Sequence, residues 1–119
     1  MLKLNILLEA KMIQADTYQA ALTIIRLLEK KYQVSPVAME LMITHLVMAT
    51  ERVRVNQIVE PMTEVIYANI VASESFKVAT QALDEILQLS VVEFPDSEQQ
   101  YLLLHLCNLM KGKNQYEVS

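Results

Sequence analysis

Two histidines, His45 and His105, are the side chains of this sequence best suited to covalent chemistry. A neutral imidazole is a nucleophile near pH 7 and needs neither a metal nor an added base to become one. A histidine on an apolar helix face is also commonly a hydrogen-bonded core residue, so both interpretations apply to each position. The residues three and four positions from His45 are all apolar: Leu41, Met42, Met48 and Ala49.

Each histidine has a polar partner seven residues away, which is nearly two helical turns. Arg52 follows His45 at this spacing, and Glu98 precedes His105. Arg52 could bind a phosphoryl group on a histidine through its bidentate guanidinium, although two turns separate the backbones by roughly 10 Å. Glu98 could hold a ring nitrogen of a histidine and fix its tautomer. Equally, Glu98 could be a first-turn carboxylate favoured by the helix dipole.

The helix face of His105 also carries Tyr101 and Asn108. Tyr101 could be a core residue with a polar tip, and Asn108 a surface residue late in the helix. Cys107 is expected to be a small buried hydrophobe and not a nucleophile. The sequence has no short-spaced ligand pair such as H-x-x-x-H, and its one glycine cannot build a phosphate-binding loop. We therefore expect no metal site and no cofactor.

Helical periodicity runs through the region that carries these residues, with apolar side chains at three- and four-residue intervals. Ser35-Pro36 predicts a helix start, because Ser caps well and Pro at the first position loses no hydrogen bond. Asp16–Gln19 and Asp96–Gln99 match the capping box. Ser73 or Ser75 could cap a further helix. We predict an all-α, compact bundle of about five helices, over residues 16–32, 36–54, 60–71, 75–89 and 97–111.

The chain is expected to form one helical domain over residues 16–112. Residues 1–15 form an N-terminal segment, in which Leu4, Leu7 and Leu8 have helical spacing but could also lie in an extended stretch. The third helix is predicted to open at Glu60-Pro61. Gly112 is predicted to cap the last helix, and residues 113–119 form a polar tail.

Composition excludes several classes of protein. Of 119 residues, 53% are apolar and 20% are charged, which excludes a disordered tail. With a net charge of −4, the chain lacks the excess of basic residues expected of a protein that binds nucleic acid directly. The single cysteine favours a reducing compartment, and no apolar run is long enough to span a membrane, so we expect a cytoplasmic protein that does not contact membrane.

Three segments of this chain resemble those of the PRD, the phosphotransferase-system regulation domain of bacterial antiterminators and activators. Residues 42–53, MITHLVMATERV, match the family's His and its Arg seven residues later. Residues 60–65, EPMTEV, resemble the family's NPL..EI segment, with Glu60 where the family usually has Asn. Residues 94–108, FPDSEQQYLLLHLCN, resemble the signature P.dE..Y..lHl.N. The two histidine motifs lie in order about sixty positions apart, and together they are fairly specific.

The resemblance implies a five-helix domain that works as a homodimer and is regulatory, not an enzyme. It also implies that His45 and His105 are phosphorylated by the phosphocarrier HPr or by an enzyme IIB component, with Arg52, Glu98, Tyr101 and Asn108 in support. In the family, phosphorylation shifts the dimer and controls an attached RNA-binding or DNA-binding domain. The resemblance runs from about Asp16 to Leu109, so only some fifteen residues precede it. We therefore expect the output to lie on a separate regulator chain, or this chain to be part of a larger regulator.

Two alternatives remain at this stage. The chain could be a helical protein-protein adaptor that keeps the PRD fold without phosphorylation. It could also be a small all-α enzyme, which would need basic residues converging on a pocket. The ten basic residues are dispersed along the sequence, and only pairs such as Arg52 and Arg54 are close together, so the enzyme is the weakest alternative.

Overall fold

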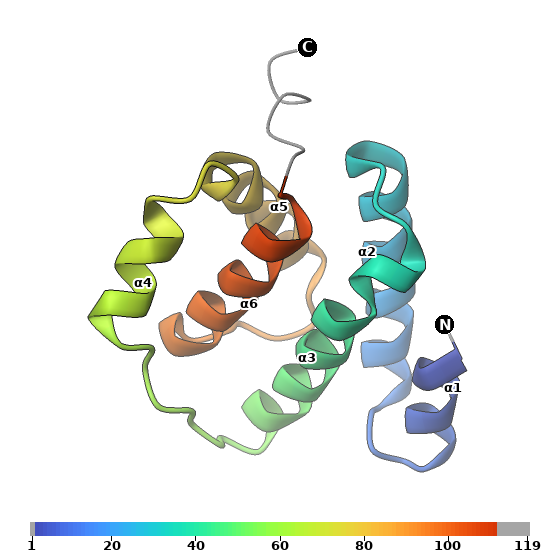
Figure 1. Cartoon of the computed structure of the whole chain (residues 1–119). Helices are drawn as coiled ribbons and strands as arrows, with labels where there is room; N and C mark the ends of the chain where they lie inside the picture. Colours follow the sequence, from blue (N-terminus) through green and yellow to red (C-terminus); the bar gives the residue numbers. More distant parts are fainter. Residues whose placement is uncertain (1, 112–119) are drawn as a thin grey trace.

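The computed structural model describes residues 2–111, and this range contains six α-helices and no β-strand (Figure 1). The predicted all-α fold is therefore confirmed. The predicted Gly112 cap and the tail over residues 113–119 lie outside the described residues. The helices are α1 (Leu2–Glu9), α2 (Ala15–Tyr32), α3 (Pro36–Arg54), α4 (Glu64–Val71), α5 (Phe76–Leu89) and α6 (Asp96–Leu109).

The start of α3 follows the predicted capping pattern. Ser35 is the N-cap, and its side-chain oxygen accepts a hydrogen bond from the backbone N–H of Ala38 at 3.2 Å. Pro36 occupies the first helical position, where its missing N–H leaves no intrahelical bond unmade. The end of α3 at Arg54 was also predicted, so the helix that carries His45 could be bounded from local signals alone.

The third predicted helix begins later than the sequence suggested. Helix α4 starts at Glu64 and not at Glu60, and Thr63 is its N-cap, accepting a hydrogen bond from Ile66 N–H at 3.4 Å. The side-chain Oε1 of Gln100 on α6 accepts a hydrogen bond at 3.1 Å from the backbone N–H of Met62. This bond ties the residues before α4 to α6, and the cap of the helix is Thr63 and not a residue before Pro61, so the start predicted from Glu60-Pro61 is wrong.

Both predicted capping boxes are also wrong. Gln14 and Pro95 occupy the N-cap positions of α2 and α6, and neither makes a side-chain capping bond. Asp16 lies inside the first turn of α2, where Arg54 binds it. Gln99 donates from Nε2 to the carbonyl oxygen of Phe94 at 2.9 Å. Asp16 and Gln99 therefore bind partners other than the backbone N–H groups that a capping box would pair them with.

The predicted serine cap of α5 is replaced by a tertiary hydrogen bond. Ser75 stands at the N-cap position but makes no capping bond, and its hydroxyl donates to the backbone carbonyl of Cys107 on α6 at 2.8 Å. The Ser73 oxygen accepts from the Ser75 N–H at 3.2 Å. Ser75 is buried, so this bond ties the start of α5 to the end of α6.

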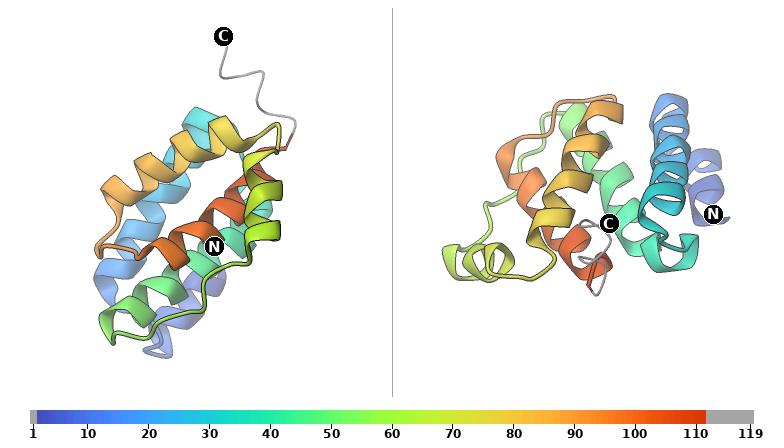
Figure 2. Two further views of the ribbon diagram at one scale, coloured as in Figure 1. Left: turned by 90° about the vertical axis from the view of Figure 1, so that its left-hand side faces the viewer. Right: turned by 90° about the horizontal axis from the view of Figure 1, so that it is seen from above.

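Helix α3 packs against α2 on one side and α6 on the other, and α5 packs against α6 and α2. Helices α1 and α4 lie at opposite edges of this four-helix core, α1 against α2 and α4 against α6 (Figure 2). None of the helices within residues 2–111 is long and apolar enough to cross a membrane. The largest fully buried apolar side chains include Leu28, Met39, Ile43, Ile86, Leu102 and Leu106.

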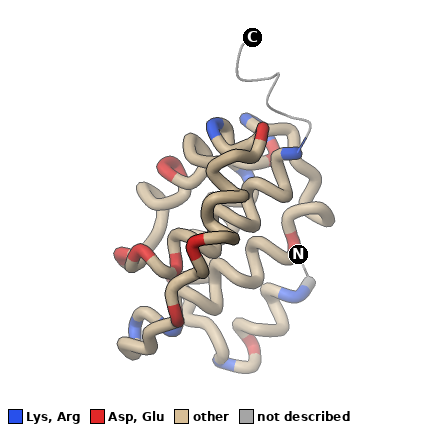
Figure 3. The backbone as a smooth tube through the Cα atoms, turned by 60° about the vertical axis from the view of Figure 1, so that its left-hand side comes forward, with Lys and Arg blue, Asp and Glu red and all other residues tan. Residues whose placement is uncertain are grey.

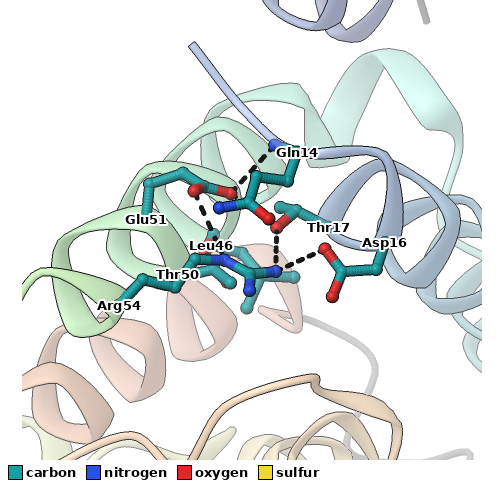
Figure 4. Close-up of polar contacts among 7 residues, drawn as sticks. All are labelled: Gln14, Asp16, Thr17, Leu46, Thr50, Glu51 and Arg54. Atoms are coloured by element: carbon teal, nitrogen blue, oxygen red, sulfur yellow. Dashed lines mark hydrogen bonds and ion pairs between the residues drawn. The ribbon is translucent and has the colours of Figure 1, made fainter. Parts of the chain in front are cut away.

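A polar network fixes the start of α2 to the last turn of α3 (Figure 4). Arg54 forms an ion pair with Asp16 and donates from Nη2 to the Thr17 hydroxyl oxygen at 3.0 Å. The Thr17 hydroxyl donates in turn to Glu51 Oε2 at 2.5 Å, and the Gln14 backbone N–H donates to the same oxygen at 3.2 Å. Arg54 therefore has a structural role, because it holds the end of α3 to α2. Other residues of α3 form its contacts with α6.

Candidate functional site

The packing of α3 against α6 brings the two histidines into contact. The ring centroids of His45 and His105 are 4.8 Å apart, and the ring planes are tilted by 40°. Farther along the same interface, Arg52 on α3 meets Glu98 on α6. Because ascending positions on α3 meet descending positions on α6, the two helices are antiparallel. The two polar pairs with seven-residue spacing, His45 with Arg52 and Glu98 with His105, thus lie on one interface between α3 and α6, which we call the α3–α6 seam.

Arg52 and Glu98 form a bidentate ion pair. Arg52 donates from Nε to Glu98 Oε2 at 3.0 Å and from Nη2 to Glu98 Oε1 at 3.1 Å. Glu98 is fully buried, whereas the Arg52 side chain is 27% exposed. A buried carboxylate needs such a partner, since an unpaired charge in the interior is costly. The guanidinium that the sequence suggested as a phosphoryl ligand is therefore bound by Glu98 in the unmodified chain.

Glu98 also faces the histidine pair. Its Oε1 lies 3.6 Å from Nε2 of His45, which is beyond hydrogen-bond length. That nitrogen is buried and makes no hydrogen bond with the described part of the chain. Glu98 therefore lies between Arg52 and His45 and accepts its two hydrogen bonds from the arginine.

Both histidines are held in the neutral form. Burial lowers the pKa of His45, and His105 and Arg52 nearby lower it further, while the Glu98 carboxylate opposes them. Burial also lowers the pKa of His105. Near pH 7 the two rings are therefore uncharged, and a neutral imidazole has the free lone pair that a nucleophile needs.

The free energy of unfolding is expected to fall as the pH drops from about 7 to about 5. Because both histidines have folded-state pKa values below that of an unfolded chain, the unfolded chain binds more protons in this range. The stability gained by keeping the rings neutral is complete above the unfolded pKa and is lost as the pH falls from there toward the folded values.

Denaturant titrations across this pH range measure the effect, and the variant His45→Gln/His105→Gln is the control because it carries neither ring. The variant should give a flatter profile than the wild type. Equal slopes for the two proteins would show that the histidines do not cause the loss.

Tyr101 and Asn108 lie on different sides of the histidine pair. The half-buried Tyr101 ring lies 6.3 Å from the His45 ring, centroid to centroid. Asn108 is exposed and lines an open depression of about 270 Å³ together with His105. His105 can therefore be reached from solvent through this depression. Its other lining residues are Ala38, Leu41 and Met42 of α3 and Leu109 of α6.

The walls of this depression were not identified as part of the site from the sequence. Leu41 and Met42 appeared only as apolar neighbours of His45, yet they line the surface that leads to His105. The periodicity of α3 shows that they share a face with His45, but not which residues of α6 that face meets. Only the antiparallel packing of α3 on α6 places them beside the second histidine.

Cys107 does not belong to this site. It is buried, and burial raises the pKa of its thiol, which makes it a poor nucleophile. Within residues 2–111, no group of three or more His, Cys, Asp or Glu side chains is arranged to hold a metal ion. The lysines and arginines of this range are spread over several helices (Figure 3).

Comparison with protein-family models identifies a family for this chain. The family model described as "PRD domain" matches residues 36–109, from the start of α3 to the end of α6. This range contains both histidines and their partners Arg52 and Glu98. None of the curated proteins and none of the solved structures matches the chain.

Proposed function

Because the chain belongs to the PRD family, we propose that it is a regulatory module of bacterial carbohydrate-linked transcription control that responds to histidine phosphorylation. PRD domains are regulatory and not catalytic. The phosphodonor is HPr or an enzyme IIB component of the sugar phosphotransferase system, and the acceptors are His45, His105 or both. The observation that carries the proposal is the pair of neutral histidines in contact, one of which opens to solvent.

The chemistry requires little beyond this geometry. A ring nitrogen attacks the phosphorus on the donor's phosphorylated side chain, a new N–P bond forms, and the bond between phosphorus and the donor's side chain breaks as that side chain leaves. The product carries about −1.5 to −2 charges near pH 7. Arg52 is the nearby cation that can neutralise this charge, and to do so it must share or give up its bond with Glu98. Phosphorylation is thus coupled to the α3–α6 seam.

Phosphotransfer is tested by incubating the protein with radiolabelled phosphoenolpyruvate, enzyme I, HPr and candidate enzyme IIB components. The wild type is expected to incorporate acid-labile phosphate, and His45→Ala/His105→Ala is expected to incorporate none. The single variants show which ring accepts the group. If no donor labels the wild type, the chain is an adaptor that keeps the fold without phosphorylation. If the double variant is labelled as strongly as the wild type, the proposed sites are wrong.

The functional unit is proposed to be a homodimer built on the face around the depression beside His105. Val37 and Leu41 on this part of α3 are 83% and 71% exposed, which is unusual for large apolar side chains. A second copy of the chain would cover them through a two-fold interface, as the family resemblance implies. A charge added at His105 would then lie close to the interface and change its strength.

Sedimentation at micromolar concentration is expected to show the unmodified protein as a dimer. Leu41→Lys should shift it toward monomer, because the lysine places a charge on the proposed interface. Val65→Lys is the matched control, since Val65 is 74% exposed but lies on α4 at the far edge of the bundle. A wild type that sediments as a monomer, or equal effects of the two variants, would contradict this interface.

The proposed domain comprises residues 16–112, because α2 packs on α3 and shares its core although it precedes the family match. The proposed phosphodonors are cytoplasmic proteins, so the chain is proposed to work in the cytoplasm. The dispersed basic residues and the net charge of −4 support an output through another regulator chain instead of direct nucleic-acid binding.

A further inference from the structure

We propose that His45 and His105 act as one acceptor, so that the folded chain holds a single phosphoryl group on the pair at a time. This inference rests on the proposed function and specifies its stoichiometry. It predicts three chemical states for the folded chain: unmodified, modified at His45 and modified at His105. Two independent histidines would add a fourth state, modified at both.

The distance between the rings is the first argument. With centroids 4.8 Å apart, a phosphoryl group on one ring lies close to the other ring. Each group would carry about −1.5 to −2 charges, and two such groups would repel strongly because they are so close and the rings are only partly exposed to water. The first group therefore opposes the second both by its volume and by its charge.

The charges around the pair are the second argument. The groups that act on His45 are His105, Glu98 and Arg52. Glu98 is a fully buried anion 3.6 Å from His45, and Arg52 already neutralises it through two hydrogen bonds. One added phosphoryl group can compete with Glu98 for Arg52. A second would add further negative charge to a place where the described contacts supply no additional cation.

Accessibility is tested separately from proximity. His105 lines the open depression, and the His45 side chain is 22% exposed although its Nε2 is buried. We expect each ring to react when the other has been replaced, and a variant that takes no group would show that burial sets the limit. The limit comes from the proximity of the rings, which makes it testable with single substitutions.

The experiment uses potassium phosphoramidate, which phosphorylates histidine without a protein donor. The ring nitrogen forms a bond to phosphorus, the P–N bond of the reagent breaks, ammonia leaves, and the imidazole proton passes to solvent. Intact-mass spectrometry then counts phosphoryl groups per chain. The folded wild type is expected to stop at one group, with the second addition at least about tenfold slower. The same chain unfolded in urea should take two.

The single variants separate mutual exclusion from simple burial. Folded His45→Gln and folded His105→Gln are each expected to take one group, as the wild type does. If either variant takes none, one ring is merely inaccessible and the inference is wrong. It is also overturned if the folded wild type takes two groups at similar rates, or takes none.

The reagent also separates this inference from the proposed function. If phosphoramidate gives one group but no protein donor labels the chain, the proposed function fails and the single-acceptor pair stands. If protein donors place two groups on the folded chain, the proposed function stands and this inference fails.

Discussion

Replacing Met42 with aspartate is expected to lower the free energy of unfolding by about 3–5 kcal/mol. Met42 is 2% exposed and belongs to the core formed where α3 meets α6. The substitution removes buried apolar contacts and adds a carboxylate at a position where the described contacts include no neighbouring cation. The chain must either bury the charge, protonate it or open the seam, and each of these is costly. Urea titration near pH 7 measures the loss.

The control for this substitution is Val65→Asp, which introduces the same group on an exposed side of α4. It is expected to change stability by no more than about 0.5 kcal/mol, because the carboxylate stays in water. If Met42→Asp costs as little as this control, Met42 faces solvent and the packing of α3 on α6 is not as described.

Replacing Arg52 with methionine is expected to cost about 3–5 kcal/mol, because it leaves the buried Glu98 carboxylate without its partner. The double variant Arg52→Met/Glu98→Leu should recover most of this loss, since it removes the stranded charge and fills the space with apolar atoms. A double-mutant cycle by denaturant titration measures the coupling between the two residues.

Arg54→Met is the matched control for Arg52, because it makes the same change two residues later on the same helix. Arg54 pairs with Asp16, whose side chain is 54% exposed, and with Glu51. Water can solvate Asp16 in this variant, and the less exposed Glu51 keeps its hydrogen bonds from Thr17 and Gln14, so the expected loss is about 1 kcal/mol. Equal losses for Arg52→Met and Arg54→Met would show that burial of Glu98 does not set the cost.

Local signals predicted helix bounds where the deciding contacts are local. Ser35 and Pro36 sit next to the turn that they start, so the beginning of α3 could be predicted from adjacent residues. The Glu60-Pro61 start was wrong: Thr63 caps α4 instead, and the residues before it are tied to α6, where Gln100, nearly forty positions later, binds the backbone of Met62. The cap assigned to Asp16 failed for the same reason, since its partner is Arg54 on another helix.

The candidate site could also be predicted only as far as its contacts lie within one helix. The spacing of His45 and Arg52, and of Glu98 and His105, placed each pair on one helix face. Periodicity within a helix does not give the direction of its neighbour. The sequence therefore indicated two separate faces, whereas the antiparallel packing joins histidine to histidine and arginine to glutamate. The bond that occupies Arg52 in the unmodified chain could not be foreseen without that arrangement.

The last turn of α3 is held to both of its neighbours by charge, and the two attachments should respond differently to ionic strength. Arg54 binds α2 through the half-exposed Asp16, where dissolved ions can screen the attraction. Arg52 binds α6 through Glu98, whose side chain is 1% exposed and largely beyond their reach. Added salt would therefore loosen the α2 side of this turn while the seam that carries the histidines keeps its geometry.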